Sequence, residues 1–243
     1  MMKNIGRLYS FLPYSFKQQD CFIKYNYKYL FCALRKCSSQ NKEHSYLDFN
    51  SNLSDEEKTA IVKNMMVLEN FVSNDDEMSI LNEIEPYLKK LHYEFNHWDD
   101  AIHGFRETEK QKWNIENSKI LDRLRNIAFP LNCNQLQHVH VLDLSPNGYI
   151  KPHIDSTRFC GNTIAGLCLL SDAVMRLVHK DNNVNYIDVL LKRRSLYIMR
   201  DVARYDYTHE ILPNSSSVFR KKTIPRTRRI SVICRNEPNK NES

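Results

Sequence analysis

Short β-prone runs separated by turns fill the second half of the chain, and this pattern limits the possible folds more than any other feature. The runs are rich in Val, Ile, Leu, Thr and Tyr, which favour half-buried strands. Seven are recognisable, at residues 138–144, 163–170, 174–179, 186–191, 196–200, 208–212 and 230–234. The polar triplet at 181–183 suits a hairpin turn between two of them. Seven short strands at this spacing predict a jelly-roll-like sandwich or barrel rather than a parallel sheet.

Helical patterns occupy residues 54–130. Ser54 and Glu57 have the spacing of a capping box, and apolar residues follow at helical intervals. Three amphipathic helices are expected: 54–69 after that cap, 73–91 with a kink or break at Pro86, and 118–128 before Pro130. The stretch 92–113 between them is aromatic and rich in His, with no clean period. We therefore expect an α+β fold whose N-terminal helices pack outside a strand-built core.

The length of 243 residues and the hydrophobic content of 42% suit one domain with terminal extensions. We expect the domain at 46–236, with its helical part at 54–130 and its jelly roll at 137–236. A disordered tail is expected at 237–243. No apolar run reaches the roughly 20 residues needed to cross a bilayer, so no membrane span is expected.

The formal net charge of +6 is concentrated in the first 40 residues, which hold seven basic side chains and one acidic side chain. The rest of the chain holds 28 of each sign, so the body of the protein is neutral. Residues 1–45 are also rich in Ser, Tyr and Phe and lack the apolar core of a secretory signal. This composition predicts a mitochondrial presequence and a location in the matrix; a disordered basic segment is the alternative.

A His-x-Asp triplet lies in the strand-rich half, upstream of another histidine. In an extended segment His153 and Asp155 leave the same face, and His209 on a separate strand would complete a facial triad for iron(II). The triplet alone is weak evidence, because a second one occurs at 97–99 in the α-rich half. For His97 and Asp99 we favour packing, capping or a channel-lining role.

Two arginines strengthen the interpretation. Arg229 and Arg235 are six residues apart, so on one strand they project from the same face. An inward-facing pair of guanidinium groups needs an anion, and a dicarboxylate fits their two-pronged geometry. In the alternative, both arginines face solvent while Val232 and Cys234 face inward.

The region from about 65 to 236 resembles the AlkB-like iron(II)- and 2-oxoglutarate-dependent dioxygenases, and among them a mitochondrial member. The resemblance is carried by the segments at 97–99, 102–109, 140–144, 148–156, 159–161, 163–167, 195–198, 203–211 and 228–235. It implies a double-stranded β-helix core and iron ligation by His153, Asp155 and His209.

The resemblance also implies that 2-oxoglutarate is held by Arg229, Arg235 and the Tyr197 hydroxyl. Family members that act on nucleic acid contact this co-substrate through an Asn and a Tyr, and the aligned positions here are Leu142 and Leu144. We expect Tyr197 to compensate. The resemblance further implies oxidation of the substrate with O₂ and roles in programmed necrosis and in fatty acid and energy metabolism. We expect a monomer.

Charge bears on the substrate. The stretch 93–113 holds five acidic residues against three basic ones, so affinity for phosphate backbones should be poor and duplex DNA is not expected. A basic run at 220–228 is the exception, and a solvated loop is its favoured interpretation. The leading hypothesis is hydroxylation of a protein or another non-duplex substrate. Demethylation of mitochondrial RNA such as tRNA is the first alternative, and a regulatory binding module that keeps the iron pocket is the second.

Overall fold

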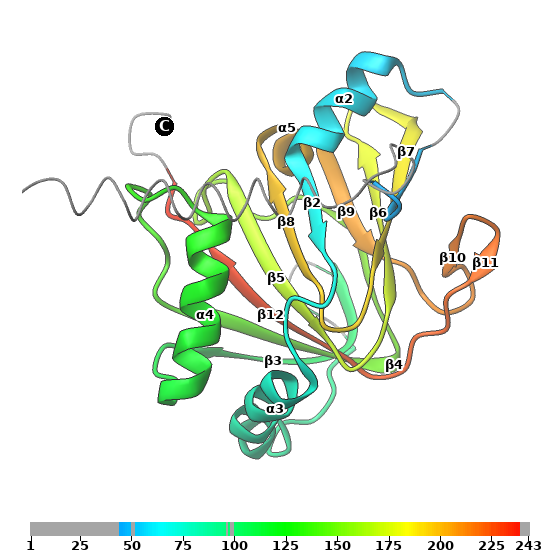
Figure 1. Cartoon of the computed structure of the whole chain (residues 1–243). Coiled ribbons are helices and arrows are strands. Elements are labelled where there is room, and N and C mark those ends of the chain that lie inside the picture. The colour runs from blue at the N-terminus through cyan, green and yellow to red at the C-terminus, as the bar shows by residue number, and fades with distance from the viewer. Residues whose placement is uncertain (1–43, 50–51, 96, 98–99, 239–243) are drawn as a thin grey trace, which may run out of the picture. The chain divides into compact units, whose positions relative to one another are not determined.

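A ten-stranded antiparallel sheet, curled on itself, forms the body of the protein (Figure 1). The computed structural model describes residues 44–49, 52–95, 97 and 100–238. Most of the expected presequence, most of the expected C-terminal tail, Trp98 and Asp99 therefore lie outside the described residues. In spatial order the strands are β1 (Leu47–Phe49), β7 (Asn182–Leu191), β6 (Ala173–His179), β9 (Tyr207–Ile211), β4 (Val139–His153), β12 (Arg229–Arg235), β5 (Thr163–Leu169), β8 (Leu196–Arg200) and β2 (Met65–Leu68). The tenth strand, β3 (Ile102–Lys110), pairs with β4, and a separate hairpin joins β10 (Val218–Phe219) to β11 (Lys222–Thr223).

The fifteen-residue strand β4 belongs to both halves of the curled sheet. Its first half pairs with β12 on one side and β3 on the other. Its last residues pair with β9, where Ile150 lies opposite Ile211 and His153 opposite His209. The register between β4 and β9 therefore brings two histidines that are far apart in sequence to adjacent positions.

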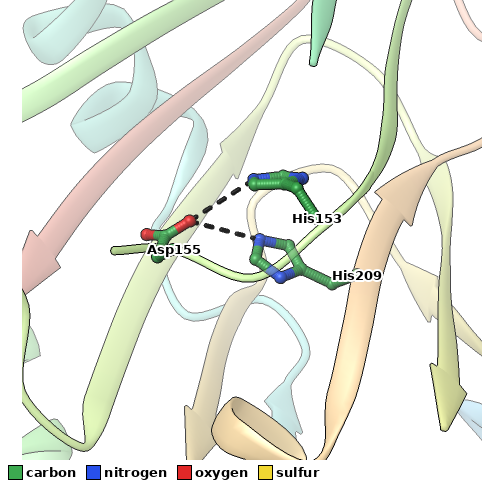
Figure 2. Close-up of side chains that lie close together, drawn as sticks. All are labelled: His153, Asp155 and His209. Atoms are coloured by element: carbon green, nitrogen blue, oxygen red, sulfur yellow. Dashed lines mark ion pairs between the residues drawn. The ribbon is translucent and has the colours of Figure 1, made fainter. Parts of the chain in front are cut away.

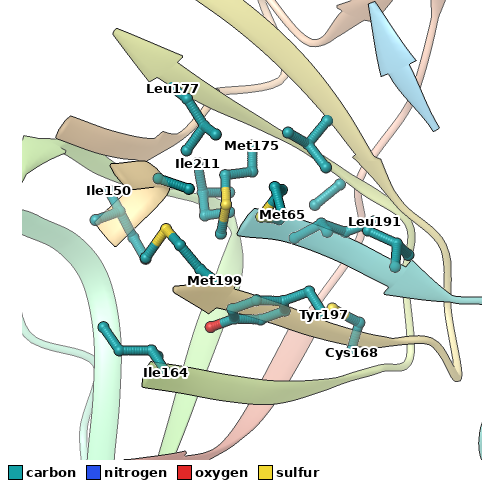
Figure 3. Close-up of a cluster of buried hydrophobic side chains, with 14 of the residues drawn as sticks. Met65, Ile150, Ile164, Cys168, Met175, Leu177, Leu191, Tyr197, Met199 and Ile211 are labelled. Carbon is teal, nitrogen blue, oxygen red and sulfur yellow. The ribbon is translucent and has the colours of Figure 1, made fainter. Parts of the chain in front are cut away.

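Side-chain alternation gives the sheet an inner and an outer apolar face. The inner cluster fills the curl, and Figure 3 shows Tyr197, Cys168 and Met199 within it. The outer cluster includes Val141, Leu167 and Val232, and two helices cover it: α3 (Asn74–Leu88) and α4 (Ile115–Ala128). The α+β jelly-roll core with amphipathic helices outside is thus confirmed.

Local capping explains where the helices begin. The expected capping box at Ser54 opens α2 (Asp55–Asn64), and a second box at Ser73 opens α3. Pro86 lies in the last turn of α3, and the helix continues through it to Leu88 rather than dividing into two. Asn114 caps α4, which begins at Ile115, three residues before the expected start. A short helix, α5 (Asp201–Tyr205), links β8 to β9.

Three segments differ from the expected elements. The first helix ends at Asn64 rather than near Glu69, because Met65–Leu68 forms β2 and pairs with β8. The stretch 92–113, which has no clean period, contains the nine-residue strand β3. The strand expected to end at Leu144 continues to His153, passing Gly148, whose backbone lies against Gly104 too closely for a Cβ atom.

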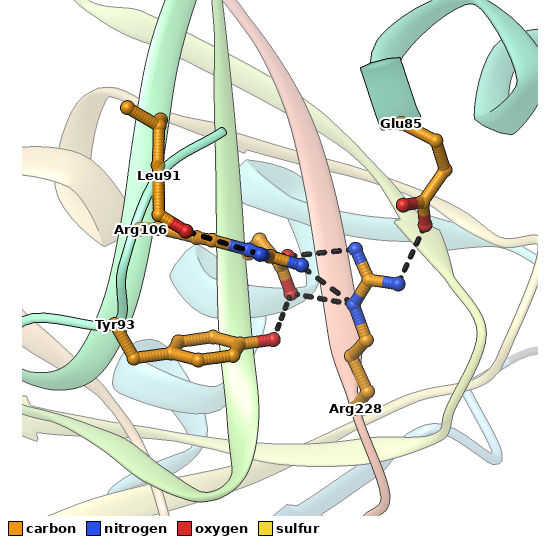
Figure 4. A network of polar contacts seen from close by, with 6 residues as sticks. Glu85, Leu91, Tyr93, Arg106 and Arg228 are labelled. Atoms are coloured by element: carbon orange, nitrogen blue, oxygen red, sulfur yellow. Dashed lines mark hydrogen bonds and ion pairs between the residues drawn. The ribbon is translucent and has the colours of Figure 1, made fainter. Parts of the chain in front are cut away.

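A buried charge network ties the helical cover to the sheet. Asp143 on β4 has a fully buried side chain and accepts hydrogen bonds from Arg106, Arg228 and Tyr93 (Figure 4). Arg228 also pairs with Glu85 of α3 at 2.5 Å. Burial alone would lower the pKa of Arg228, but the hydrogen bonds that it donates to Asp143 and Glu85 raise that pKa above its ordinary value.

Candidate metal centre

His153, Asp155 and His209 converge where β4 meets β9, at the inner face of the sheet (Figure 2). Their potential ligand atoms all lie within 4.8 Å of one another, and no other group of three or more such residues occurs among the residues the structure describes. Nε2 of His153 lies 3.4 Å from Oδ1 of Asp155, and Nε2 of His209 lies 3.6 Å from the same oxygen. Two imidazole nitrogens and one carboxylate oxygen are the donor set of a facial iron(II) triad.

In His153 and Asp155, the side-chain atoms that do not face the metal have partners, which leaves the metal-facing atoms available. His153 Nδ1 lies 2.9 Å from the Lys151 carbonyl, an acceptor, so the ring proton is on Nδ1 and Nε2 keeps its lone pair. Oδ2 of Asp155 accepts from Nε of Arg235 at 2.7 Å. The carboxylate therefore offers Oδ1 to a metal while Oδ2 is neutralised, and the set fits a divalent ion.

The charge states fit ligation as well. Burial alone would raise the pKa of Asp155, but the positive charge of Arg235 is the largest effect in the opposite direction, and that pKa lies well below its usual value. Burial, followed by the neighbouring His153, lowers the pKa of His209 to about 3. An ionised carboxylate and a neutral imidazole are the forms that bind metal.

One residue that supports the centre was not among the predicted site residues. Arg204 on α5 is fully buried, and its Nη2 donates to the backbone carbonyl of Asp155 at 2.7 Å. Its Nε and Nη1 have no hydrogen-bond partner in the described part of the chain. Sequence spacing gave no sign of this role, because α5 is too short to show a period.

The two predicted arginines share the inner face of β12. Arg229 is 2% exposed, and its Nη2 donates to Sγ of Cys168 at 3.5 Å. Arg235, six residues on, reaches the metal centre through Asp155. The alternative in which both face solvent is wrong, and Val232 and Cys234 are buried on the opposite, helix-covered face.

Tyr197 on β8 lies beside this arginine pair. It is opposite Gly166 of β5, and a Cβ atom at residue 166 would meet the ring carbons and hydroxyl of Tyr197 within 2.7 Å, so the ring lies directly over that glycine. Burial raises the pKa of Tyr197, so its hydroxyl stays protonated and can donate. Nε of Arg229 is buried without a hydrogen-bond partner in the described residues, which suits a site that receives an anionic ligand.

Leu142 and Leu144 lie on the same inner face, at 3% and 0% exposure, in the apolar cluster that contains Tyr197. Their side chains bear no polar group that could contact a carboxylate. His97 of the second triplet does not join the metal centre: it packs edge-on against Phe105, and its Nε2 lies 3.4 Å from Glu107. Asp99 lies outside the described residues.

Comparisons with known proteins agree with the site. No protein-family profile matches the chain. The chain is 53% identical over 168 residues to the alpha-ketoglutarate-dependent dioxygenase alkB homolog 7, mitochondrial, of Mus musculus, and 54% identical over 168 residues to that of Bos taurus. Both matches cover 69% of this chain and 76% of the relative.

Among solved structures, a Pseudomonas putida prolyl-4-hydroxylase shares the fold at a TM-score of 0.51 and 16% identity, covering 72% of this chain and 93% of the other. The mouse and cattle relatives are dioxygenases that depend on alpha-ketoglutarate, which is 2-oxoglutarate, and the triad needed for that chemistry is complete here. The chain therefore belongs to the alkB homolog 7 family and is an iron(II)- and 2-oxoglutarate-dependent dioxygenase.

Proposed function

We propose that this dioxygenase hydroxylates a protein or another non-duplex substrate in the mitochondrial matrix. His153, Asp155 and His209 hold the iron, while Arg229, Arg235 and Tyr197 hold 2-oxoglutarate. The iron with its co-substrate supplies the oxidising power for hydroxylating a C–H bond. The protein supplies ligands of fixed charge, orients the co-substrate and keeps water out.

The two carboxylates of 2-oxoglutarate would be bound by different side chains. Arg229 and Tyr197 are buried together on the inner face, so they would take the carboxylate distant from iron, the arginine by charge and the tyrosine by a hydroxyl donor. Arg235 is bound to the iron ligand Asp155 and would take the carboxylate that lies beside the metal. Cys168 is the present partner of Arg229 and would be exchanged for the stronger anionic acceptor.

The choice of substrate rests on one observation: most basic side chains of the run at 220–228 are already bonded within the protein. Arg226 is 2% exposed and bonds backbone carbonyls, including those of Ser145 and Gly148. Arg228 forms ion pairs with Asp143 and Glu85, and Arg220 donates a hydrogen bond to the Leu47 carbonyl. Only two lysines of the run remain exposed without such a bond among the described residues, Lys221 and Lys222. A loop that leaves so few cations available has little affinity for phosphate backbones.

A substrate screen tests the proposal. Full-length protein is loaded with iron(II) and 2-oxoglutarate without oxygen, then exposed to oxygen with mitochondrial protein extract or with methylated RNA. Wild type should form succinate in excess of Asp155→Ala, and the protein fraction should raise the yield. Succinate from wild type no higher than from Asp155→Ala would exclude the assigned site. Formaldehyde that depends on methylated RNA would instead support RNA demethylation, because oxidised N-methyl groups release it.

Location and physiological role are part of the proposal. The relatives are named mitochondrial, and the basic, acid-poor composition of residues 1–45 supports import into the matrix. A fluorescent protein fused to residues 1–45 should co-purify with the matrix fraction; diffuse cytosolic signal would contradict this. The roles in programmed necrosis and in fatty acid and energy metabolism rest on the family resemblance alone.

A further inference from the structure

A row of polar side chains continues the metal centre across the inner face of the sheet. It runs over three adjacent strands, from Arg235 on β12 to His140 on β4 and Glu107 on β3. In the register, His140 lies opposite Ile233 of β12 and opposite Glu109 of β3. Arg235 and Glu107 are each two residues from those partners, so both are diagonal neighbours of His140 on the same face.

The donor and the acceptor of each hydrogen bond in this row can be assigned. Arg235 donates through Nε to Asp155 at 2.7 Å, and its Nη1 lies 3.3 Å from Nδ1 of His140. Because arginine has only donors, Nδ1 of His140 is the acceptor and the ring proton is on Nε2. Nε2 lies 2.8 Å from Oε2 of Glu107, which only accepts when ionised. The hydrogen bond from His140 lowers the pKa of Glu107 and keeps it in that form.

The arrangement restricts how Arg235 can pair with Asp155. A guanidinium and a carboxylate prefer two parallel hydrogen bonds, which would occupy both oxygens of Asp155. In this structure Arg235 reaches only Oδ2, and Oδ1 faces the two histidines. The contact with His140 holds Nη1 away from the carboxylate, so the metal-facing oxygen stays available.

We propose that His140 is a positioning residue for Arg235, and that Glu107 fixes His140 in the Nε2–H tautomer which that task requires. The row keeps Arg235 bonded once to Asp155 with its remaining donors aimed at the co-substrate. This inference rests on the proposed function, in which Arg235 is a co-substrate ligand.

Binding measurements without turnover test it. Full-length protein is loaded with Mn(II), and the dissociation constant for 2-oxoglutarate is measured by calorimetry without oxygen. His140→Leu should raise that constant about tenfold, the effect of losing one charge-assisted contact. His140→Gln should stay within about threefold of wild type, because its amide can accept from Arg235 and donate to Glu107. His138→Leu, at an exposed position just before β4, is the matched control and should change nothing.

A double-mutant cycle shows whether His140 acts through Arg235. In an Arg235→Lys background, His140→Leu should have almost no further effect. Three results would each overturn the inference. The first is equal affinity of His140→Leu and wild type for 2-oxoglutarate, and the second is an equal loss of affinity in the Leu and Gln variants. The third is a full tenfold loss of affinity on adding His140→Leu to Arg235→Lys. If His140→Leu fails to fold, Glu107→Leu probes the same row, and an unchanged constant there would overturn it. Wild type that binds Mn(II) but no 2-oxoglutarate would refute the proposed function instead.

Discussion

At the scale of single residues, Asp155 gives its two oxygens different tasks. Oδ1 faces the ligand nitrogens of His153 and His209, and Oδ2 is neutralised by Arg235. Arg204 fixes the backbone of the same residue from the other side. A buried carboxylate is held ionised in this way although burial alone would protonate it.

Removing the hydroxyl of Tyr197 tests its role as a donor. Tyr197→Phe keeps the ring over Gly166 but loses one hydrogen bond to a carboxylate, so the dissociation constant for 2-oxoglutarate should rise roughly tenfold. Binding of Mn(II) alone should not change. Tyr207→Phe, at another buried tyrosine on a different strand, is the control, and a loss of equal size there would contradict a specific role for Tyr197.

Asp143 is a residue of the fold rather than of the site, although it lies on β4 between two inner-facing residues. Asp143→Ala would leave Arg106 and Arg228 without their shared acceptor, so the free energy of unfolding should fall by about 3 kcal/mol. Asp181→Ala, in an exposed turn, should change it by less than about 0.5 kcal/mol. Denaturant titration measures both values. A fall for Asp143→Ala as small as the control's would mean that the network adds little.

At the scale of elements, the missed strands have identifiable physical causes. In β3 neither face is apolar along its length: Glu107 faces the inner polar row, and Arg106 faces Asp143. Period-two alternation is therefore absent from the sequence. In β2, Met65 is buried beside Ile61 and so matches a helical stripe, but pairing with β8 prevails over that local pattern.

The cap of α3 offers a test at the same scale. Ser73 accepts from the amide of Asp76, whose carboxylate accepts from the amide of Ser73. Ser73→Ala should lower the free energy of unfolding by about 1 kcal/mol. Ser73→Asp should retain most of the stabilisation that the cap provides, because an aspartate side chain also caps helices. Thermal and denaturant unfolding provide the comparison. Equal losses in both variants would show that the serine hydroxyl acts in some other way.

At the scale of the whole molecule, the sequence predicted the core and the chemistry better than the support around them. Short strands with apolar alternation revealed the jelly roll, and a same-face pair of arginines was visible from spacing. The sequence did not reveal that Arg204 reaches the centre or that His140 and Glu107 extend it, because their positions depend on strand register and on the short helix α5. The two histidine ligands meet through pairing between β4 and β9, which no local pattern encodes.

Metal should stabilise the domain, since the ligands come from β4 and β9, two strands that are far apart in sequence and pair in the sheet. Mn(II) at about one hundred times its dissociation constant should add about 2.7 kcal/mol to the free energy of unfolding. For a domain of this size the melting temperature should then rise by roughly 5–10 °C. Asp155→Ala should show no such rise. A similar rise in that variant would place the stabilising metal elsewhere in the protein.

The ring of Tyr197 over Gly166 also marks a place for chemical engineering. Because residue 166 has no side chain, replacing Tyr197 by alanine would open a hole floored only by backbone. A 2-oxo acid with an added bulky group could fill that hole, while the ring of the natural enzyme would exclude it. Among all the dioxygenases of a cell, only the engineered protein would use this enlarged co-substrate. Products formed with it would therefore identify the substrates of the engineered protein.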